Sequence, residues 1–380
     1  MWIRALSGSV PPAARVCAAA LVGIALGCAA ALRAPVVLTA EAPSASERYC
    51  AWYGDARDGV LYFGEAPFWA ALRANGGDPR ADLLHPGPQL IGRFDLAHRR
   101  FLPPLDLSPV GSQAGVWDVL AHPNGRVYFS DYFGRAGYVE PDGGRVVRFD
   151  ALGTGLNELA LGPDGTILVT RYGSGGDGAG SVMQLDEEGA LVAEHPVRGP
   201  AGYRAAPKSV AYDPVRREIW LNADLLPEGA GRSGSVRYDT RVLGLDGTER
   251  LRFEQPEVQF MAFGPDGTGW FAEVDGASLT LRVRPPELAA SPVLTGRLVP
   301  LDDAFAREVD FVQDIKLSGD VAVVTRWSGR VHVVDRDGSV RSAELPKQQG
   351  ELYYTGVLAD GAVCATLCGD LSVACGPISK

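Results

Sequence analysis

The stretch HPNGRVYFSDYFG, from His122 to Gly134, returns in nearly the same form as GPDGTILVTRYG from Gly162 and as GPDGTGWFAEVDG from Gly264. Each copy joins a turn signal of the Pro-Asn-Gly or Pro-Asp-Gly type to a short apolar run of Val, Ile and aromatic residues. This order is typical of a hairpin turn that enters a β-strand. Its recurrence along one chain predicts a repeat architecture.

Seven segments that contain the second strand of this phrase can be aligned without gaps. They are GVLYFGE from 59, RVYFSDY from 126, TILVTRY from 166, EIWLNAD from 218, TGWFAEV from 268, VAVVTRW from 321 and AVCATLC from 362. Their spacing is roughly 40 to 53 residues apart from one longer first gap, as in units of four strands. No amphipathic helix separates the strands. We therefore predict an all-β fold, a β-propeller with four-stranded antiparallel blades.

The number of blades depends on how the two ends of the chain are assigned. Our count favours seven blades with the last one incomplete, and six remain open if the first and last fragments share a blade. The long first gap contains a Gly- and Pro-rich insertion, residues 66–89, between the second and third strands of the first blade. Insertions of this kind form loops on one face of a repeat protein, often the binding face.

Charge composition restricts the partners. The 380 residues contain 46 acidic and 36 basic side chains, which gives a net charge of -10. Such a chain repels polyanions, so we expect no nucleic-acid binding. We expect a monomer whose partner is a small polar ligand or an envelope protein.

The N-terminal residues differ from the rest of the chain. Arg4 and Arg15 precede an uncharged run from Val16 to Leu32, the order of an export signal. The ending IALGC at 24–28 is similar to a bacterial lipobox, which predicts lipidation of Cys28 and membrane tethering. A secretory peptide cleaved near AAA and an uncleaved membrane anchor remain alternatives, and all three place the fold outside the cytoplasm, in the periplasm or cell envelope. We assign residues 1–27 to the signal, 28–47 to a linker and 48–380 to one propeller domain.

Four cysteines remain outside the export segment, an even number for an oxidising compartment. If Gly369 and Asp370 form a two-residue hairpin turn, counting outward places Cys364 opposite Cys375. Cys50 lies in the first blade and Cys368 in the last, and a closed ring brings those blades together. We therefore favour the pairs Cys364–Cys375 and Cys50–Cys368 among the three possible connectivities.

The repeated GPDG-plus-strand phrase resembles the NHL-repeat and senescence marker protein/gluconolactonase-like group of propellers, over residues 48–380. That resemblance implies a divalent metal such as Ca²⁺ in the central funnel, held by a Glu, an Asn and an Asp. Asn157 matches the Asn, but RYCAWYGD contains no Glu, and Gln259 or Gln313 stands where the Asp is expected. Asp118, Glu158 and Asp314 are neighbours that could compensate. No cofactor follows from the residues themselves.

Propeller geometry predicts where the polar residues converge, because the first strand of each blade starts at the face where the second strand ends. The strand-start row comprises Trp117, Asn157, Lys208, Gln259, Gln313 and Thr355. The strand-end row comprises Asp131, Arg171, Asp224, Glu273 and Arg326, with Tyr172 and Trp327 beside it. Polar residues at strand ends can simply face water, but charges mixed with aromatic rings also suit a polar ligand.

From these rows we predict an extracytoplasmic module that binds a polar ligand or partner at the funnel. We expect the amide side chains of Asn157, Gln259 and Gln313 to line the mouth, and an anionic or polyhydroxylated ligand is favoured by these amides together with the charges around them, which are Arg171, Glu273 and Arg326. The alternative is a metal-dependent hydrolase of lactones or related esters, and a structural role in an envelope assembly remains open. The motif GSGGDG at 173–178 has dinucleotide-binding spacing, but another strand follows it instead of a helix, so we interpret it as a loop.

Overall fold

The structure is a computed structural model. It describes residues 35–39, 50–66, 90–110, 116–131, 134–149, 152–173, 180–228, 237–254, 256–287, 294–305, 310–346, 352–368 and 372–379. In these ranges the regular structure is β-strand, apart from two short 3₁₀ turns at Ser108–Val110 and Pro163–Gly165. No helix in the same ranges is long and apolar enough to cross a membrane.

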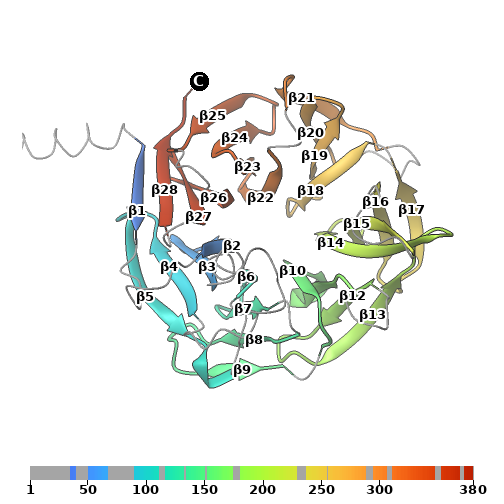
Figure 1. Ribbon diagram of the computed structural model, residues 1–380, viewed down its shortest axis with the longest axis horizontal. Helices are drawn as coiled ribbons and strands as arrows, with labels where there is room; N and C mark the ends of the chain where they lie inside the picture. The colour runs from blue at the N-terminus through green and yellow to red at the C-terminus, as the bar shows by residue number, and fades with distance from the viewer. Residues whose placement is uncertain are drawn as a thin grey trace, which may run out of the picture.

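Five separate four-stranded antiparallel sheets follow one another around a ring (Figure 1). They are β6–β9 (Asp118–Ala121, Val127–Ser130, Ala136–Val139, Val146–Arg148), β10–β13 (Leu156–Leu161, Ile167–Arg171, Gly180–Leu185, Leu191–Val197), β14–β17 (Tyr203–Asp213, Glu218–Pro227, Arg237–Gly244, Glu249–Phe253), β18–β21 (Glu257–Phe263, Gly269–Asp275, Ser278–Arg284, Arg297–Asp302) and β22–β25 (Val312–Ser318, Val321–Arg326, Arg330–Asp335, Val340–Glu344). The fold is therefore the expected β-propeller with four-stranded antiparallel blades.

The two ends of the chain share an eight-stranded sheet that completes the ring. Its members are β1 (Val36–Thr39), β2 (Cys50–Arg57), β3 (Val60–Ala66), β4 (Leu90–Asp95), β5 (Arg100–Asp106), β26 (Leu352–Ala359), β27 (Ala362–Cys368) and β28 (Ser372–Pro377). Its N-terminal strand β1 pairs with β28, and β2 meets β27 through the single residue pair Cys50 and Cys368. Because this sheet joins the first and last strands, the count of seven blades stays a prediction.

The repeated phrase has one structural role in each unit. In the second copy, the turn at Pro163–Gly165 requires left-handed backbone, with φ of 54° at Asp164 and 80° at Gly165, and Asp and Gly tolerate this conformation best. The strand that follows, β11, is buried over Ile167, Leu168 and Val169. Apolar strands are needed here because neighbouring sheets pack face to face around the ring.

Packing between neighbouring sheets forms the core. Tyr128, Tyr138 and Phe149 from one sheet join Ile167 and Val169 of the next sheet in one buried cluster. Burial of aromatic and branched side chains of this size is the main favourable contribution to folding. The core is thus a series of inter-sheet layers rather than one central cluster.

Both predicted disulfides are present. Cys50 is bonded to Cys368 across the junction of β2 and β27, and Cys364 is bonded to Cys375 within the hairpin of β27 and β28. The export signal with Cys28, the predicted linker of residues 28–47 except 35–39, and the insertion from 67 to 89 lie outside the described residues. So does most of the 173–178 loop.

Candidate ligand-binding site at the centre of the ring

The start of each innermost strand and the end of the neighbouring strand lie at one face of the ring, which we call the mouth face. The register shows this directly, because Leu156 pairs with Arg171 and Val312 pairs with Arg326. Cys50, at the start of β2, likewise meets Cys368, at the end of β27. Both predicted rows of polar residues therefore belong to the mouth face.

A cavity of about 420 Å³, including space open to solvent, lies among the innermost strands. Its lining residues are Tyr53, Trp117, Asp118, Asn157, Glu158, Lys208, Phe260, Asp314 and Lys316. Three residues of the predicted strand-start row, Trp117, Asn157 and Lys208, line this cavity. The predicted neighbours Asp118, Glu158 and Asp314 also reach the cavity.

Aromatic rings form much of the wall. Tyr53 and Trp117 lie 6.3 Å apart between ring centroids, and Trp117 also packs 4.7 Å from Trp52. Across the cavity, the Lys208 ammonium lies 5.5 Å from the centre of the Phe260 ring and makes no ion pair with any described residue. The wall thus offers flat apolar surfaces beside one cation that no carboxylate neutralises.

The carboxylates below the wall connect each sheet to the next one. Asp118 accepts a hydrogen bond from the backbone N–H of Leu159 at 2.7 Å, and Glu158 accepts one from Val210 at 3.1 Å. In the same way Asp55 accepts one from Ala121 at 3.1 Å. These side chains are held in place by the ring and at the same time stabilise it.

The electrostatics of this layer centre on Lys316. Its ammonium lies 3.4 Å from Asp314 Oδ2. Burial alone would lower the pKa of Lys316, but the carboxylates of Asp314, Asp55, Asp118 and Glu158 raise it above its usual value. Lys316 therefore stays charged and partly compensates the four acidic groups.

The acidic groups themselves hold protons more tightly than usual. Burial raises the pKa of Asp118 to about 7, although Lys316 opposes the change. Burial, followed by repulsion from Asp118 and Asp314, holds the pKa of Glu158 well above its ordinary value. Asp118 and Glu158 thus hold a proton more readily than ordinary carboxyl groups, and a protonated carboxyl group can donate a hydrogen bond whereas an ionised one accepts.

This donor set does not fit the divalent metal that the family resemblance implies. Asp118 uses both oxygens on backbone N–H groups, and Asn157 donates through Nδ2 to the carbonyl of Lys208 at 2.7 Å. A cation, Lys316, already stands among the carboxylates. Among the described residues, no three His, Cys, Asp or Glu side chains are grouped as a metal would require.

Two further residues of the strand-start row, Gln259 and Gln313, are buried beside the cavity and are committed to protein contacts. Gln259 accepts a hydrogen bond from the backbone N–H of Val312 at 3.0 Å, and Gln313 accepts one from the hydroxyl of Tyr53 at 2.9 Å. Thr355 accepts one from the backbone N–H of Gly54 and donates to Asp314. They support the cavity from behind.

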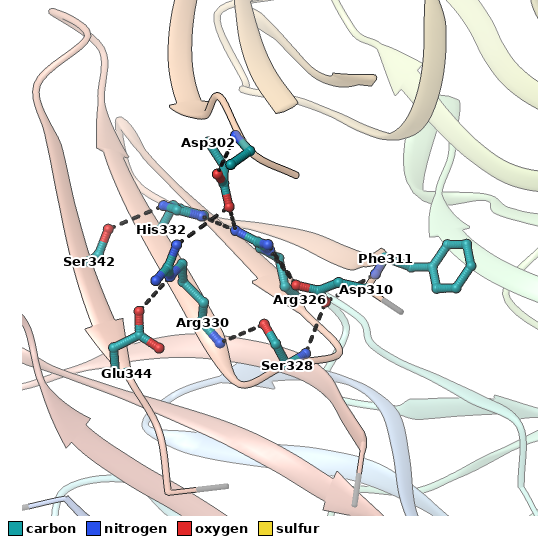
Figure 2. Close-up of polar contacts among 10 residues, drawn as sticks. Asp302, Asp310, Phe311, Arg326, Ser328, Arg330, His332, Ser342 and Glu344 are labelled. Atoms are coloured by element: carbon teal, nitrogen blue, oxygen red, sulfur yellow. Dashed lines mark hydrogen bonds and ion pairs between the residues drawn. The ribbon is translucent and has the colours of Figure 1, made fainter. Parts of the chain in front are cut away.

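The residues of the strand-end row contact other protein groups instead of lining the cavity. Arg326 is the clearest case (Figure 2). Its guanidinium is buried and lies 2.6 Å from Asp310 and 2.7 Å from Asp302. Beside it, burial and the positive charges of Arg326 and Arg330 lower the pKa of His332 to about 3, so His332 is neutral. Trp327 packs its ring edge-on against Phe311 at 4.7 Å. None of these groups lines the cavity.

The other strand-end residues are also engaged outside the cavity. Arg171 pairs with Glu194 at 2.6 Å, and both carboxylate oxygens of Glu273 accept hydrogen bonds from one edge of the Arg282 guanidinium, Nε and Nη2. Asp224 accepts a hydrogen bond from the hydroxyl of Tyr172 at 2.7 Å. Asp131, which is fully buried, accepts one from the backbone N–H of Arg135 at 2.8 Å. None of these four strand-end residues lines the cavity, so their predicted role in ligand binding stays a prediction.

Sequence reasoning missed several cavity residues. Tyr53, Phe260 and Lys316 lie two or more residues inside their strands, beyond the strand-start positions. Lys316 could have been found from the two-residue period of a strand. It lies two residues after Asp314 in β22, so both side chains face the same side. No sequence pattern indicated that the Tyr53 hydroxyl would donate a hydrogen bond to Gln313 on a distant strand.

No protein-family model matches this chain, and no curated protein matches its sequence. Solved structures do match. A catalytically inactive virginiamycin B lyase from Staphylococcus aureus with quinupristin has a TM-score of 0.56 at 10% identity, covering 91% of this chain and 100% of that one. The β-propeller domain of Swd1 from Myceliophteria thermophila gives 0.57 at 12% identity, covering 88% and 98%.

The computationally designed protein Ika8 gives a TM-score of 0.53 at 15% identity, covering 87% of this chain and 97% of that one. A lyase and a designed protein sharing this architecture illustrate that a propeller fits many functions. At identities this low the likeness shows the β-propeller fold, and the chemistry has to be argued from the cavity itself.

Proposed function

We propose that this chain is an extracytoplasmic binding module that takes a neutral, polyhydroxylated ligand into the cavity at the mouth face. The observation that carries the proposal is the composition of the cavity wall and floor. Aromatic rings of Tyr53, Trp117 and Phe260 stand beside side chains that both donate and accept hydrogen bonds. Two disulfides among the described cysteines support an oxidising compartment outside the cytoplasm.

Charge decides between the two ligand classes that the sequence favoured. The anionic class depended on Arg171 and Arg326, and both guanidinium groups are paired with carboxylates away from the cavity. Lys316 is already paired with Asp314, so Lys208 is the one cation among the described lining residues left to attract a ligand carboxylate, and Asp118 opposes that attraction once it is ionised. Hydroxyl groups can donate to carboxylates and accept from Lys208 and Lys316, and a sugar-like ring can lie flat on Trp117.

Thermal unfolding in the presence of matched ligands tests this proposal. A neutral hexose and two hexuronic acids all keep the pyranose ring and differ mainly in charge. We expect the neutral sugar to raise the melting temperature and the two acids to have a smaller effect, because a ligand that binds the folded state stabilises it. Lys208→Met should weaken the effect of the hexose, and Arg171→Met is the matched control that should not. Stronger stabilisation by the acids, or none by any neutral polyol, would overturn the proposal.

The hydrolase alternative has one feature in its favour, which is that Asn157, Glu158 and Asp314 share one cavity. It requires a divalent metal, and the donor set does not fit one. Metal analysis of the purified protein, together with lactone hydrolysis measured with and without a chelator, decides between the two functions. Tightly held Ca²⁺ or another divalent cation and chelator-sensitive hydrolysis would favour the enzyme.

Membrane tethering through Cys28 is the remaining part of the proposal. The support is the IALGC ending after an uncharged run. One acyl chain binds a membrane only marginally, so the several chains of a bacterial lipoprotein are needed for stable anchoring. Cys28→Ala should move the protein from the membrane to the soluble fraction.

A further inference from the structure

The direction of β1 relates the N-terminus to the mouth face. Val36, at the start of β1, lies opposite Cys375, which in turn lies opposite Cys364. The later residues of β27 lead from Cys364 to Cys368 at the mouth face. Strand β1 therefore begins away from the mouth and runs toward it, along the outer edge of the ring beside β28 (Figure 1). The chain therefore enters β1 at Pro35 from the side away from the mouth.

The length of that preceding chain is short if Cys28 carries the lipid. Eight residues, from Ala29 to Val36, connect the anchor to β1. Fully extended, they span at most about 29 Å. To bring the mouth face onto the membrane, this segment would first have to reverse direction, and a turn uses about four residues.

After such a reversal, the remaining residues are too few to extend beyond the mouth face. About four extended residues reach at most about 14 Å. The four-residue rise along β27 from the level of Val36 to the mouth face is already about 13 Å. The lipid on Cys28 would then lie level with the strand ends at the outer edge of the ring, which leaves no length for the loops at that face.

Charges of both signs lie on the opposite face. Its turns carry the exposed acidic residues Asp58 and Asp360, but Asp58 lies 3.4 Å from the guanidinium of Arg57, and Arg100 is exposed on the same side. Acidic groups are repelled by a membrane that contains anionic lipids, and basic groups are attracted to it. The orientation is therefore argued from the tether and not from attraction between protein and lipid.

We infer that the lipid on Cys28 holds the ring with its mouth turned away from the membrane, so that the ligand enters from the aqueous side. This inference rests on the proposed anchor and on the proposed binding site. It excludes a lipid headgroup of the same membrane as the ligand. It favours a dissolved molecule, or the corresponding group of a partner that approaches from the far side.

Fluorescence quenching by lipids measures the orientation. The full chain with its own signal is purified as the lipidated protein and placed in vesicles that carry nitroxide-labelled headgroups. A fluorescent amino acid replaces either Ala277 or Asp320, one at a time. Ala277 follows β19 at the mouth face and Asp320 precedes β23 at the opposite face, and both positions are exposed. Quenching should remove fluorescence at Asp320 and spare it at Ala277.

Three outcomes are informative. Stronger quenching at Asp320 that disappears when a long Gly/Ser segment is inserted before Pro35 supports orientation by a short tether. Equal quenching at the two positions, or stronger quenching at Ala277, overturns it. Vesicle flotation tests the anchor separately: if the unaltered chain does not float with vesicles, the anchor and this inference both fail, while the proposed binding site is untouched.

Discussion

Two rows of polar residues lie at the same face of the ring, but their surroundings differ. Asn157 and Lys208 stand on innermost strands, which have no neighbour on the channel side, and their side chains line a cavity. Arg326 and Glu273 end the next strands outward, where sheets pack against each other, and their charges are paired and buried. Position on the innermost strand allows a side chain such as Lys208 to face a ligand but does not require it, because Gln259 and Gln313 in the same row are committed to protein contacts.

The physical reason is the cost of burying a charge. A buried guanidinium or carboxylate without a partner loses its hydration, so a position between packed sheets accepts a charge only together with its counterion. A channel position keeps access to water and can leave a cation such as Lys208 uncompensated. The comparison leads to four predictions, given from the largest expected effect to the smallest.

The disulfide between Cys50 and Cys368 should make the largest contribution to the free energy of unfolding. Cys50 starts an innermost strand and Cys368 ends the strand beside it, with 318 residues between them. Replacing both by Ser should lower the free energy of unfolding by about 5 kcal/mol, because a long loop in the unfolded chain is no longer closed. The same change at Cys364 and Cys375, only 11 residues apart, should cost about 3 kcal/mol. Urea unfolding without reductant measures both, and a larger loss for the short loop would contradict this ranking.

Glu65 is an exception that tests the pairing rule. It occupies in β3 the aligned position that Asp224 occupies in β15, but its buried carboxyl group has no hydrogen-bond partner at Oε2. Burial raises the pKa of Glu65 to about 8, so the folded chain keeps a proton that the unfolded chain releases above about pH 4.5. The free energy of unfolding therefore falls as the pH rises toward 8.

Glu65→Gln removes that ionisation. The variant should be more stable than the unaltered chain by about 3 kcal/mol at pH 7, with no difference near pH 4. Chemical unfolding at the two pH values gives the comparison. An advantage of the variant that is the same at both values would show that Glu65 is not protonated in the folded state.

Replacing Lys316 should change the free energy of unfolding by less than replacing Glu65, and this change should also depend on pH. Lys316→Met removes the ammonium that faces the channel carboxylates and leaves Asp314 with one fewer partner. We expect a loss of about 2 kcal/mol at pH 8. The loss should shrink at pH 5, because Asp118, whose pKa is about 7, and the other channel carboxyl groups with raised pKa values take up protons there. A loss that grows toward pH 5 would mean that these carboxyl groups are not the partners of Lys316.

The smallest effect is expected at Arg171. Its side chain is 20% exposed and pairs with Glu194, which is 33% exposed. Exposed pairs contribute little, so Arg171→Ala should cost less than about 1 kcal/mol. It should also leave sugar-induced stabilisation unchanged. Thermal unfolding with and without the hexose checks both points, and loss of the ligand effect would restore Arg171 to the binding site.

Much of the architecture followed from repetition in the sequence. The Pro-Asp-Gly turn and the apolar strand after it marked the second strand of each unit, and hairpin counting from Gly369 and Asp370 placed Cys364 opposite Cys375. These predictions depend on local turn geometry and on the two-residue period of a strand. Ring closure by β1 was not predicted, because four residues without a turn phrase carry no pattern of their own.

The site was harder to predict than the fold. The strand-start row led to Asn157 and Lys208, but the same reasoning treated the strand-end row as equivalent. Whether Arg326 faces a ligand or Asp302 depends on contacts between residues 24 positions apart, and periodicity within a strand does not encode them. Lys316 and Tyr53 were missed because they reach the cavity from inside their strands.

Urea unfolding of Arg326→Met beside Lys208→Met tests the central contrast most directly. Both changes remove one positive charge near the mouth face and keep an apolar side chain. Arg326→Met leaves the buried Asp310 without its cation and Asp302 with the longer contact to Arg330, and should lower the free energy of unfolding by about 4 kcal/mol. Lys208→Met removes a cation that pairs with no described carboxylate and should cost less than about 1 kcal/mol. Equal losses, or a larger loss at Lys208, would contradict the distinction between a cation that faces the cavity and a cation that pairs with carboxylates between packed sheets.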